Sequence, residues 1–207
     1  MAEQRNPYAA TNVPLEVQAS AQSPNEFGTS TVEYSTFWRR VGGALLDGLI
    51  LLPLSVLTYF GLMYTRLFYF YYFVPGLVIL GFYAIYLVKR NGGTPGKRIL
   101  DLKVVMLDGA PVTTQAAILR YSVQIALAAL STLGLAMAGF NVTDEEFQSA
   151  GYLQKITTLS THAPAWNTVV TWSAQGWYVL GAIVMLCNDK RRAVHDFIAG
   201  TVVIRTN

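Results

Sequence analysis

The sequence has few charged residues and only one cysteine. Charged residues make up 13% of its 207 residues, about half the share usual in a soluble domain, and the mean hydropathy is positive at +0.36. The lone Cys187 excludes an internal disulfide, and no Cys and His residues show metal-site spacing. The high apolar content excludes a disordered protein, and a net charge of only +3 excludes a nucleic-acid-binding domain. Something other than water must therefore solvate much of the surface.

Long stretches of the chain lack charge altogether. Residues 67–88, 121–143 and 163–188 contain no Asp, Glu, Lys, Arg or His, and residues 41–65 contain only Asp47. Each is at least as long as the roughly 20 residues that span a bilayer, and all are apolar on every face, without strand-like alternation. A soluble layer of four helices could not bury all these faces. The sequence predicts an all-α membrane protein, a four-transmembrane-helix bundle with spans near 41–61, 67–88, 116–139 and 167–187.

The distribution of basic residues predicts the orientation of the chain. Residues 1–36 are rich in Asn, Gln, Ser, Thr and Pro without apolar periodicity, which predicts a disordered tail before a transmembrane domain at residues 37–207. With four spans, thirteen of the fifteen basic residues share the side of both termini, and only Arg66 and Lys155 lie opposite. The positive-inside rule therefore predicts a multi-pass protein of the cell (inner) membrane, with both termini and the 89–115 loop in the cytoplasm.

The glycine-rich segment at residues 91–98 (NGGTPGKR) invites comparison with a phosphate-binding loop. It fails that pattern, because Asn91 stands where the first glycine belongs and Arg98 replaces the Ser or Thr that would meet magnesium. A turn that carries a basic membrane-surface patch is the better interpretation, and we expect it to contact anionic lipid headgroups. The residues of this basic loop are Gly93, Gly96, Lys97 and Arg98.

Two short β-prone segments flank the predicted third and fourth spans. Residues 100–107 are rich in Val and Leu, and Asp108-Gly109 is typical of a hairpin turn, after which Val112 is expected to start a return strand. Residues 201–205 are also β-prone and follow Gly200. The sequence thus predicts that these segments pair into a small cytoplasmic β-sheet or hairpin that caps the bundle.

Asp47 is the most informative residue of the first span. If the helix enters the membrane near Arg40, Asp47 lies about 10 Å deep, where an aspartate costs on the order of 2–3 kcal/mol and needs a partner. Arg40 lies on the same helix face, so we expect both to bracket one polar cavity completed by Arg120 or by the segment 189–196. Gly43 and Gly48 allow another helix to approach Asp47 closely.

Two interpretations of these charges stay open. One is a buried polar network that fixes helix packing, and the other is an ion or proton site, the default for an intramembrane carboxylate. Arg40 and Arg120 also suit snorkelling anchors at inner helix ends. His195 beside Asp196 suggests acid–base chemistry, but no nucleophile, metal set or cofactor motif accompanies it. We therefore expect no catalytic residue, no enzyme activity and no cofactor.

Three separated motifs together resemble one known family. Residues 37–47 (FWRRVGGALLD) place an arginine at the start of a span and an aspartate within it, residues 93–97 read GTPGK, and residues 190–203 read KRRAVHDFIAGTVV. This order resembles the RDD family of small membrane proteins, named for one arginine and two aspartates, from about residue 34 to 204. The resemblance identifies Arg40 as the arginine and Asp47 and Asp196 as the aspartates. Some members of the family are associated with sodium/proton exchange.

The leading hypothesis is a protein that moves monovalent cations or protons. Asp47 would bind and release the ion, Arg40 would tune the pKa of Asp47, and Asp196 with Arg120 would form an inner gate. Four spans are few for a transport pathway, so a homodimer or larger assembly is expected. The rival hypothesis is a non-transporting accessory, assembly or scaffold protein that holds anionic lipids or a partner on its basic face.

Overall fold

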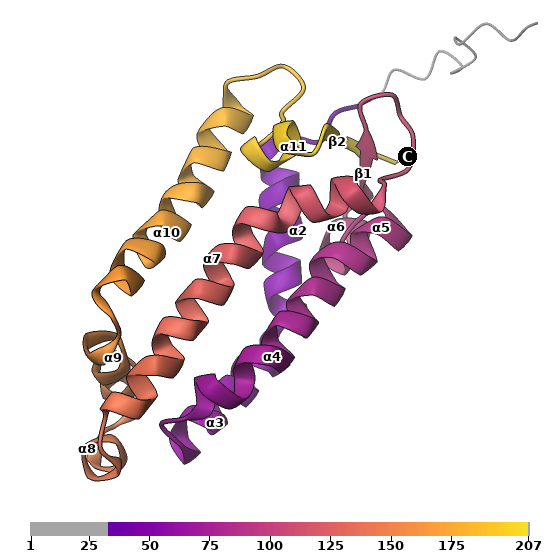
Figure 1. Cartoon of the computed structure of the whole chain (residues 1–207). Helices are drawn as coiled ribbons and strands as arrows, with labels where there is room; N and C mark the ends of the chain where they lie inside the picture. The colour runs from indigo at the N-terminus through magenta and orange to yellow at the C-terminus, as the bar shows by residue number, and fades with distance from the viewer. Residues whose placement is uncertain (1–32, 207) are drawn as a thin grey trace, which may run out of the picture. The chain divides into compact units, whose positions relative to one another are not determined.

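The computed structural model describes residues 33–206, which are mostly helical with one two-stranded sheet (Figure 1). The predicted tail lies outside the described residues except for residues 33–36. Those four residues run along the C-terminal strand, since Tyr34 forms a β-bridge with Ile204 and the Ser35 N–H donates to the Val203 carbonyl at 3.0 Å.

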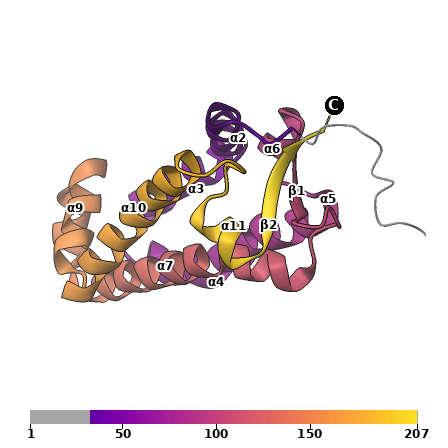
Figure 2. The same cartoon turned by 90° about the horizontal axis from the view of Figure 1, so that it is seen from above.

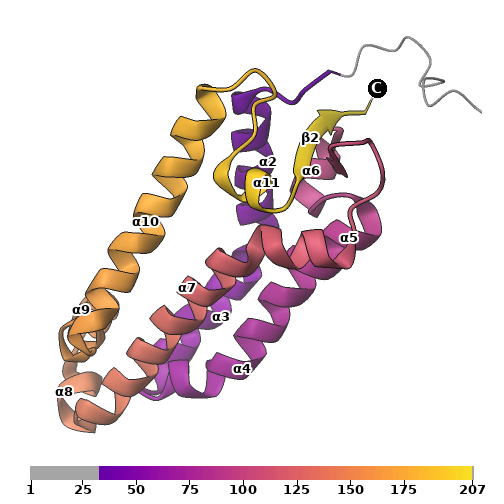
Figure 3. The same cartoon turned by 45° about the horizontal axis from the view of Figure 1, so that its top comes forward.

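The helices follow one another with short connections. Their bounds are α2 Phe37–Ile50, α3 Leu52–Tyr64, α4 Phe68–Gly81, η1 Phe82–Tyr86 (a π-helix), α5 Leu87–Asn91, α6 Pro95–Ile99, α7 Thr114–Asn141, α8 Asp144–Ser149, α9 Tyr152–His162, α10 Ala165–Leu186 and α11 Val194–Ile198. The strands are β1 Leu102–Met106 and β2 Thr201–Arg205. Helix α7 packs against α4 on one side and α10 on the other (Figure 3).

Three helical runs are long and apolar enough to cross a membrane. They extend over Phe68–Ile99, Thr114–Asn141 and Ala165–Leu186, and they contain the predicted spans near 67–88, 116–139 and 167–187. Large apolar side chains on these helices and on α2 face outward: Leu45 is 70% exposed, Val78 65% and Trp172 73%. Such exposure is expected where lipid, not water, covers the helices.

The predicted first span is not one straight helix. It is divided into α2 and α3, which are bent by 48° at Leu51, and this pair makes a fourth candidate span only if both parts cross together. Pro53 lies in the first turn of α3, where it supplies no N–H, and its ring would clash with the carbonyl four residues earlier in a continuous helix. The predicted span near 41–61 is thus a bent pair of helices, and the described residues contain three or four candidate spans.

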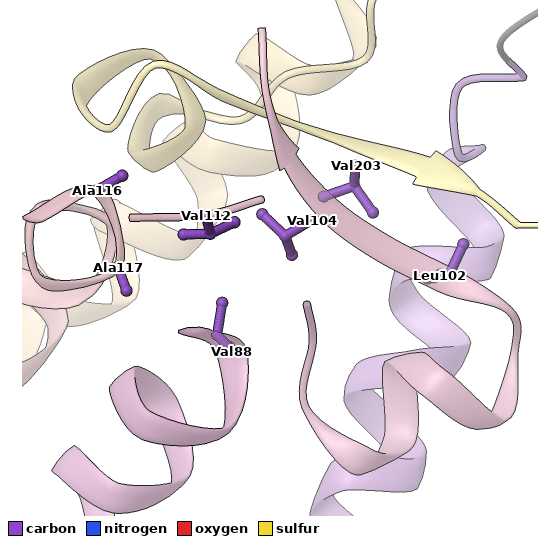
Figure 4. Packing of buried hydrophobic residues seen from close by; sticks show 7 residues of the cluster. All are labelled: Val88, Leu102, Val104, Val112, Ala116, Ala117 and Val203. Carbon is purple, nitrogen blue, oxygen red and sulfur yellow. The ribbon is translucent and has the colours of Figure 1, made fainter. Parts of the chain in front are cut away.

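The sheet joins two segments about 100 residues apart in the sequence. Strands β1 and β2 pair antiparallel, with Val104 opposite Val203, and Figure 2 shows them at the same end as α5, α6 and α11. A hydrophobic core beneath the sheet joins both strands to α5 and α7 (Figure 4). Its buried members are Val88, Leu102, Val104, Val112, Ala116, Ala117 and Val203. The predicted pairing of the two β-prone segments is confirmed.

The predicted return strand at Val112 is wrong. This stretch forms only an isolated bridge between Val105 and Pro111, and α7 begins at Thr114. Pro111 has no N–H to extend a ladder, and the Thr113 side chain instead caps α7 by accepting from the Ala116 N–H at 3.1 Å.

At the opposite end, the loop between α7 and α10 folds into the short helices α8 and α9 (Figure 1). A second core of Leu62, Phe68, Ala138, Val142, Phe147 and Leu159 holds them against α3, α4 and α7. Lys155 of α9 is buried there, with its ammonium 4.5 Å from the Phe147 ring centroid and 3.2 Å from the Met63 carbonyl.

Candidate functional site

Asp47 is held by three uncharged hydrogen-bond donors. The Tyr83 hydroxyl and the Gly96 N–H donate to its Oδ1 at 2.6 and 2.7 Å, and the Thr94 hydroxyl donates to its Oδ2 at 2.5 Å. Asp47 belongs to α2, Tyr83 to η1, and Thr94 and Gly96 to the first turn of α6. The carboxylate therefore joins three segments of chain at one point.

Glycines allow α6 to come this close to α2. A Cβ added at Gly43 would lie 3.3 Å from the Lys97 Cα, and one added at Gly96 would meet the Gly43 carbonyl oxygen and lie 2.5 Å from the Asp47 nitrogen. The predicted close approach at Gly43 is thus found, and the neighbouring element is α6. Gly48 has no neighbour within 4 Å of an added Cβ, so it plays no such part.

Asp196 forms a second and separate polar cluster with two arginines. Its Oδ2 accepts from the Arg40 Nη1 at 2.7 Å, and its Oδ1 accepts from the Arg120 Nη1. The Asp196 side chain is fully buried, and Arg120 is 2% exposed. This cluster ties α2, α7 and α11 together near the sheet.

Further donors and acceptors complete the cluster. The Arg120 Nη1 also donates to the Thr201 hydroxyl at 2.6 Å, and the Ala193 N–H donates to the Asp196 Oδ2 at 2.9 Å. Burial alone would raise the pKa of Asp196, but the charges of Arg120 and Arg40 outweigh it and hold the pKa well below its ordinary value. Asp196 is therefore an ionised carboxylate between two guanidinium groups.

The structure brings together Arg40, Arg120 and Asp196, but not Asp47. The expectation that Arg40 and Asp47 bracket one cavity is wrong, because the Arg40 side chain is directed to Asp196 and Asp47 is satisfied by α6 and η1. Arg40 and Asp47 are seven residues apart on α2, a separation of about 10 Å along the helix axis, so their side chains can contact different partners. Arg40 therefore does not tune the Asp47 carboxylate by direct contact.

The basic loop is divided between several environments. Gly93 and Gly96 are buried, Lys97 is half-buried with its ammonium 3.4 Å from the Tyr121 hydroxyl, and Arg98 is exposed. Only Arg98 of this loop thus keeps the position of a surface cation. The segment forms the short helix α6 instead of the expected simple turn. Thr94 precedes the helix and Pro95 is its first residue, a position that suits proline, and the Gly96 N–H in its first turn donates to Asp47.

Four residues that no sequence pattern indicated as site residues complete these clusters. They are Ser35, which accepts from the Arg40 Nε at 2.7 Å, together with Tyr83, Thr94 and Thr201. Thr94 stood inside a motif already singled out, whereas Tyr83 is one of 12 tyrosines and had no distinguishing pattern. Within residues 33–206, no group of three or more His, Cys, Asp or Glu side chains is placed to hold a metal ion.

Acidification is expected to destabilise the cluster through His195. Its side chain is 23% exposed and lies 4.0 Å from the Asp196 Oδ2. Burial, followed by the charge of Arg120, lowers the pKa of His195 to about 3. Below about pH 6.5 the His195 imidazole binds a proton in the unfolded chain but not in the folded chain. The free energy of unfolding therefore falls by up to about 1.4 kcal/mol per pH unit until the pH reaches the pKa of the folded state.

Thermal unfolding of the purified protein between pH 7.5 and 4.5 measures this loss. His195→Gln should reduce the slope of the melting temperature against pH, whereas His162→Gln, at an exposed position at the end of α9, is the matched control and should leave the slope unchanged. Equal slopes in the wild type and His195→Gln would contradict a neutral, buried imidazole.

Apolar helices long enough to cross a bilayer, tied by buried arginine–aspartate contacts to a small sheet at one end, define a helical membrane protein. The model of the RDD family matches residues 34–200, which is 167 of the 207 residues. The chain belongs to the RDD family. Searches of curated proteins and of solved structures give no significant match.

Proposed function

We propose that this protein moves monovalent cations or protons across the membrane by exchange of the sodium/proton type, with Asp47 as the group that binds and releases the ion. The observation that carries the proposal is the setting of Asp47. Its carboxylate meets three neutral donors, and within residues 33–206 no Lys, Arg or His side-chain nitrogen lies within 4.0 Å of its oxygens. A carboxylate that is not paired with a guanidinium or ammonium group can use its negative charge to attract a cation or a proton.

The backbone is irregular in two segments near Asp47. The 48° bend between α2 and α3 falls at Leu51, four residues after Asp47, and the π-helix η1 supplies Tyr83. Broken membrane helices and π-helical turns frequently mark ion and ligand sites, because they free backbone groups and ease local rearrangement. These features support a site that changes its coordination during a transport cycle.

A cavity leads from the bend toward Asp47. It has a volume of about 190 Å³, and Leu51, Tyr72, Thr132 and Tyr83 are among its lining residues. Tyr83 both lines this cavity and donates to Asp47, so the carboxylate is one hydrogen bond away from it. A proton or a small cation could pass between Asp47 and the cavity if this hydrogen bond opens.

Other parts of the proposal rest on the charge pattern and the ion pairs. We place the sheet and both termini in the cytoplasm of a cell (inner) membrane, and we assign Arg120 and Asp196 to an inner gate. A homodimer or larger assembly would enclose the transport pathway, because one bundle of this size has few helices with which to form it. No enzymatic role is part of the proposal.

A pH-gradient assay in proteoliposomes tests the proposal. Addition of sodium, potassium or lithium should collapse the gradient with wild-type protein, and Asp47→Asn should abolish that collapse while it elutes as a folded protein. Asp189→Asn, an exposed carboxylate at the end of α10, is the matched control and should transport normally. Transport retained by Asp47→Asn would refute the assignment of the site.

A non-transporting accessory, assembly or scaffold protein is the second candidate. It is favoured by the fact that both aspartates join segments far apart in the chain, as structural ties do: Asp47 to Thr94, and Asp196 to Arg40 and Arg120. In that case well-inserted wild type would collapse no gradient, and Asp47→Asn would lower only the amount of folded protein or the recovery of a partner.

A further inference from the structure

A second, larger cavity is lined in part by Arg40 and Arg120 of the arginine cluster. It has a volume of about 300 Å³, and its walls come from α2, α6, α7, α10 and α11. Its polar lining residues include Arg40, Lys97, Arg120, Gln124 and His195. Asp47 is not among the residues that line it, so this cavity is distinct from the proposed ion site.

The charges around this cavity do not balance. Arg40, Arg120 and Lys97 carry three positive charges, and within residues 33–206 Asp196 is the one carboxylate that forms an ion pair with any of them, which leaves a net charge of +2. The Lys97 ammonium has only the Tyr121 hydroxyl at 3.4 Å as a side-chain partner within the described part of the chain. Burial and Arg120 keep His195 neutral at pH 7 by lowering its pKa, so it adds no charge.

Within residues 33–206, two guanidinium nitrogens of residues that line this cavity are buried without an acceptor. They are the Arg40 Nη2 and the Arg120 Nε, on side chains whose residues are 8% and 2% exposed. A buried charged donor without a partner is costly, and proteins rarely leave one unpaired. Both nitrogens are covered by protein and not open to the cavity, so the excess positive charge is the observation that calls for an anion with several acceptor oxygens.

Most of the remaining lining is apolar and comes from α2 and α10. Phe37, Trp177, Tyr178 and Met185 line the cavity, and Tyr178 is also 62% exposed on the outer surface of α10. A small free anion gains no binding free energy from these apolar side chains. An amphiphile, in contrast, can place its charged group against the arginines and its apolar chain along α10. Apolar contact then adds to the binding free energy.

We propose that this cavity binds the phosphate of an anionic phospholipid, with the acyl chains lying against α2 and α10. The arginine cluster and Lys97 hold the headgroup, and the occupied cavity fixes the distance between these two helices. The proposal is independent of ion transport by Asp47, so the two can fail separately.

Native mass spectrometry of the full-length protein in detergent tests the site with phosphatidylglycerol and phosphatidylcholine as probes. Wild type should retain one phosphatidylglycerol per chain and bind phosphatidylcholine at least about tenfold more weakly. Gly181→Leu should fill the cavity, since Gly181 lines it and nothing lies within 4 Å of an added Cβ. Lys97→Gln should weaken retention by removing a charge that pairs with no carboxylate of residues 33–206.

Two control variants match these changes outside the cavity. Gly176→Leu lies on the same helix, also with nothing within 4 Å of an added Cβ, and Lys89→Gln removes an exposed charge from α5. Both should bind phosphatidylglycerol like wild type. Equal retention by all variants, or equal binding of both lipids, would overturn the proposal. Inorganic phosphate that saturates the site while phosphatidylglycerol does not bind would overturn the lipid assignment.

Discussion

Asp196→Asn is expected to cause the largest loss of folded protein, by about 3–5 kcal/mol. The substitution removes the carboxylate that pairs with both Arg40 and Arg120, and these two arginines are buried. Removing one partner from a buried ion pair leaves charges that neither water nor the protein compensates, which costs more than the pair itself contributes. The melting temperature of the purified protein and its abundance in membranes measure this loss.

Two further variants identify the cause of that loss. Asp189→Asn makes the same chemical change on an exposed residue and should keep the wild-type melting temperature. The triple variant Arg40→Met/Arg120→Met/Asp196→Leu removes every charge at once and should recover most of the stability, because an apolar cluster of similar volume needs no compensation. A melting temperature of Asp196→Asn within a degree of wild type would contradict the account of the cluster.

Gly96→Ala is expected to be nearly as damaging, by about 3 kcal/mol, although it adds one methyl group. That methyl would meet the Gly43 carbonyl oxygen and lie 2.5 Å from the Asp47 nitrogen and 2.7 Å from its Oδ1. Most of these atoms are backbone atoms of α2, which cannot move aside as a flexible side chain would. Helix α6 must therefore retreat, and Asp47 loses the Gly96 N–H and the Thr94 hydroxyl.

The matched control is Gly48→Ala, one residue after Asp47 on the same helix. Nothing lies within 4 Å of an added Cβ there, so alanine should be neutral or stabilising by up to about 1 kcal/mol through its higher helix propensity. Thermal unfolding of both variants in one detergent gives the comparison. Equal melting temperatures for the two alanine variants would show that α6 does not depend on close contact with α2.

Asp47 and Asp196 act at different places in this protein. Asp47 anchors α6 and η1 to α2 close to the bend, whereas Asp196 anchors α11 to α2 and α7 beneath the sheet. Arg40 belongs with the second aspartate, not with the first on its own helix. Variants of Arg40 and Asp196 are therefore expected to resemble each other more than either resembles a variant of Asp47.

The sequence by itself determined the membrane character, the approximate spans, the two strand segments and the family. Each follows from local composition, because the transfer of apolar residues to lipid adds up along a stretch of chain and β-propensity and turn residues act within a few positions. The bend at Leu51 could also have been predicted from the sequence, because Pro53 interrupts the predicted first span.

Only the tertiary structure decided which polar groups meet. The partners of Asp47 lie 36 to 49 residues away, and the Arg40 partner lies 156 residues away, where helical periodicity carries no information. Hydroxyl and amide donors are common in the chain, so composition could not single out Tyr83 or Thr94 for Asp47. The choice is made by packing: Gly43 and Gly96 bring α6 within contact of α2, and pairing of β1 with β2 carries Asp196 to the two arginines.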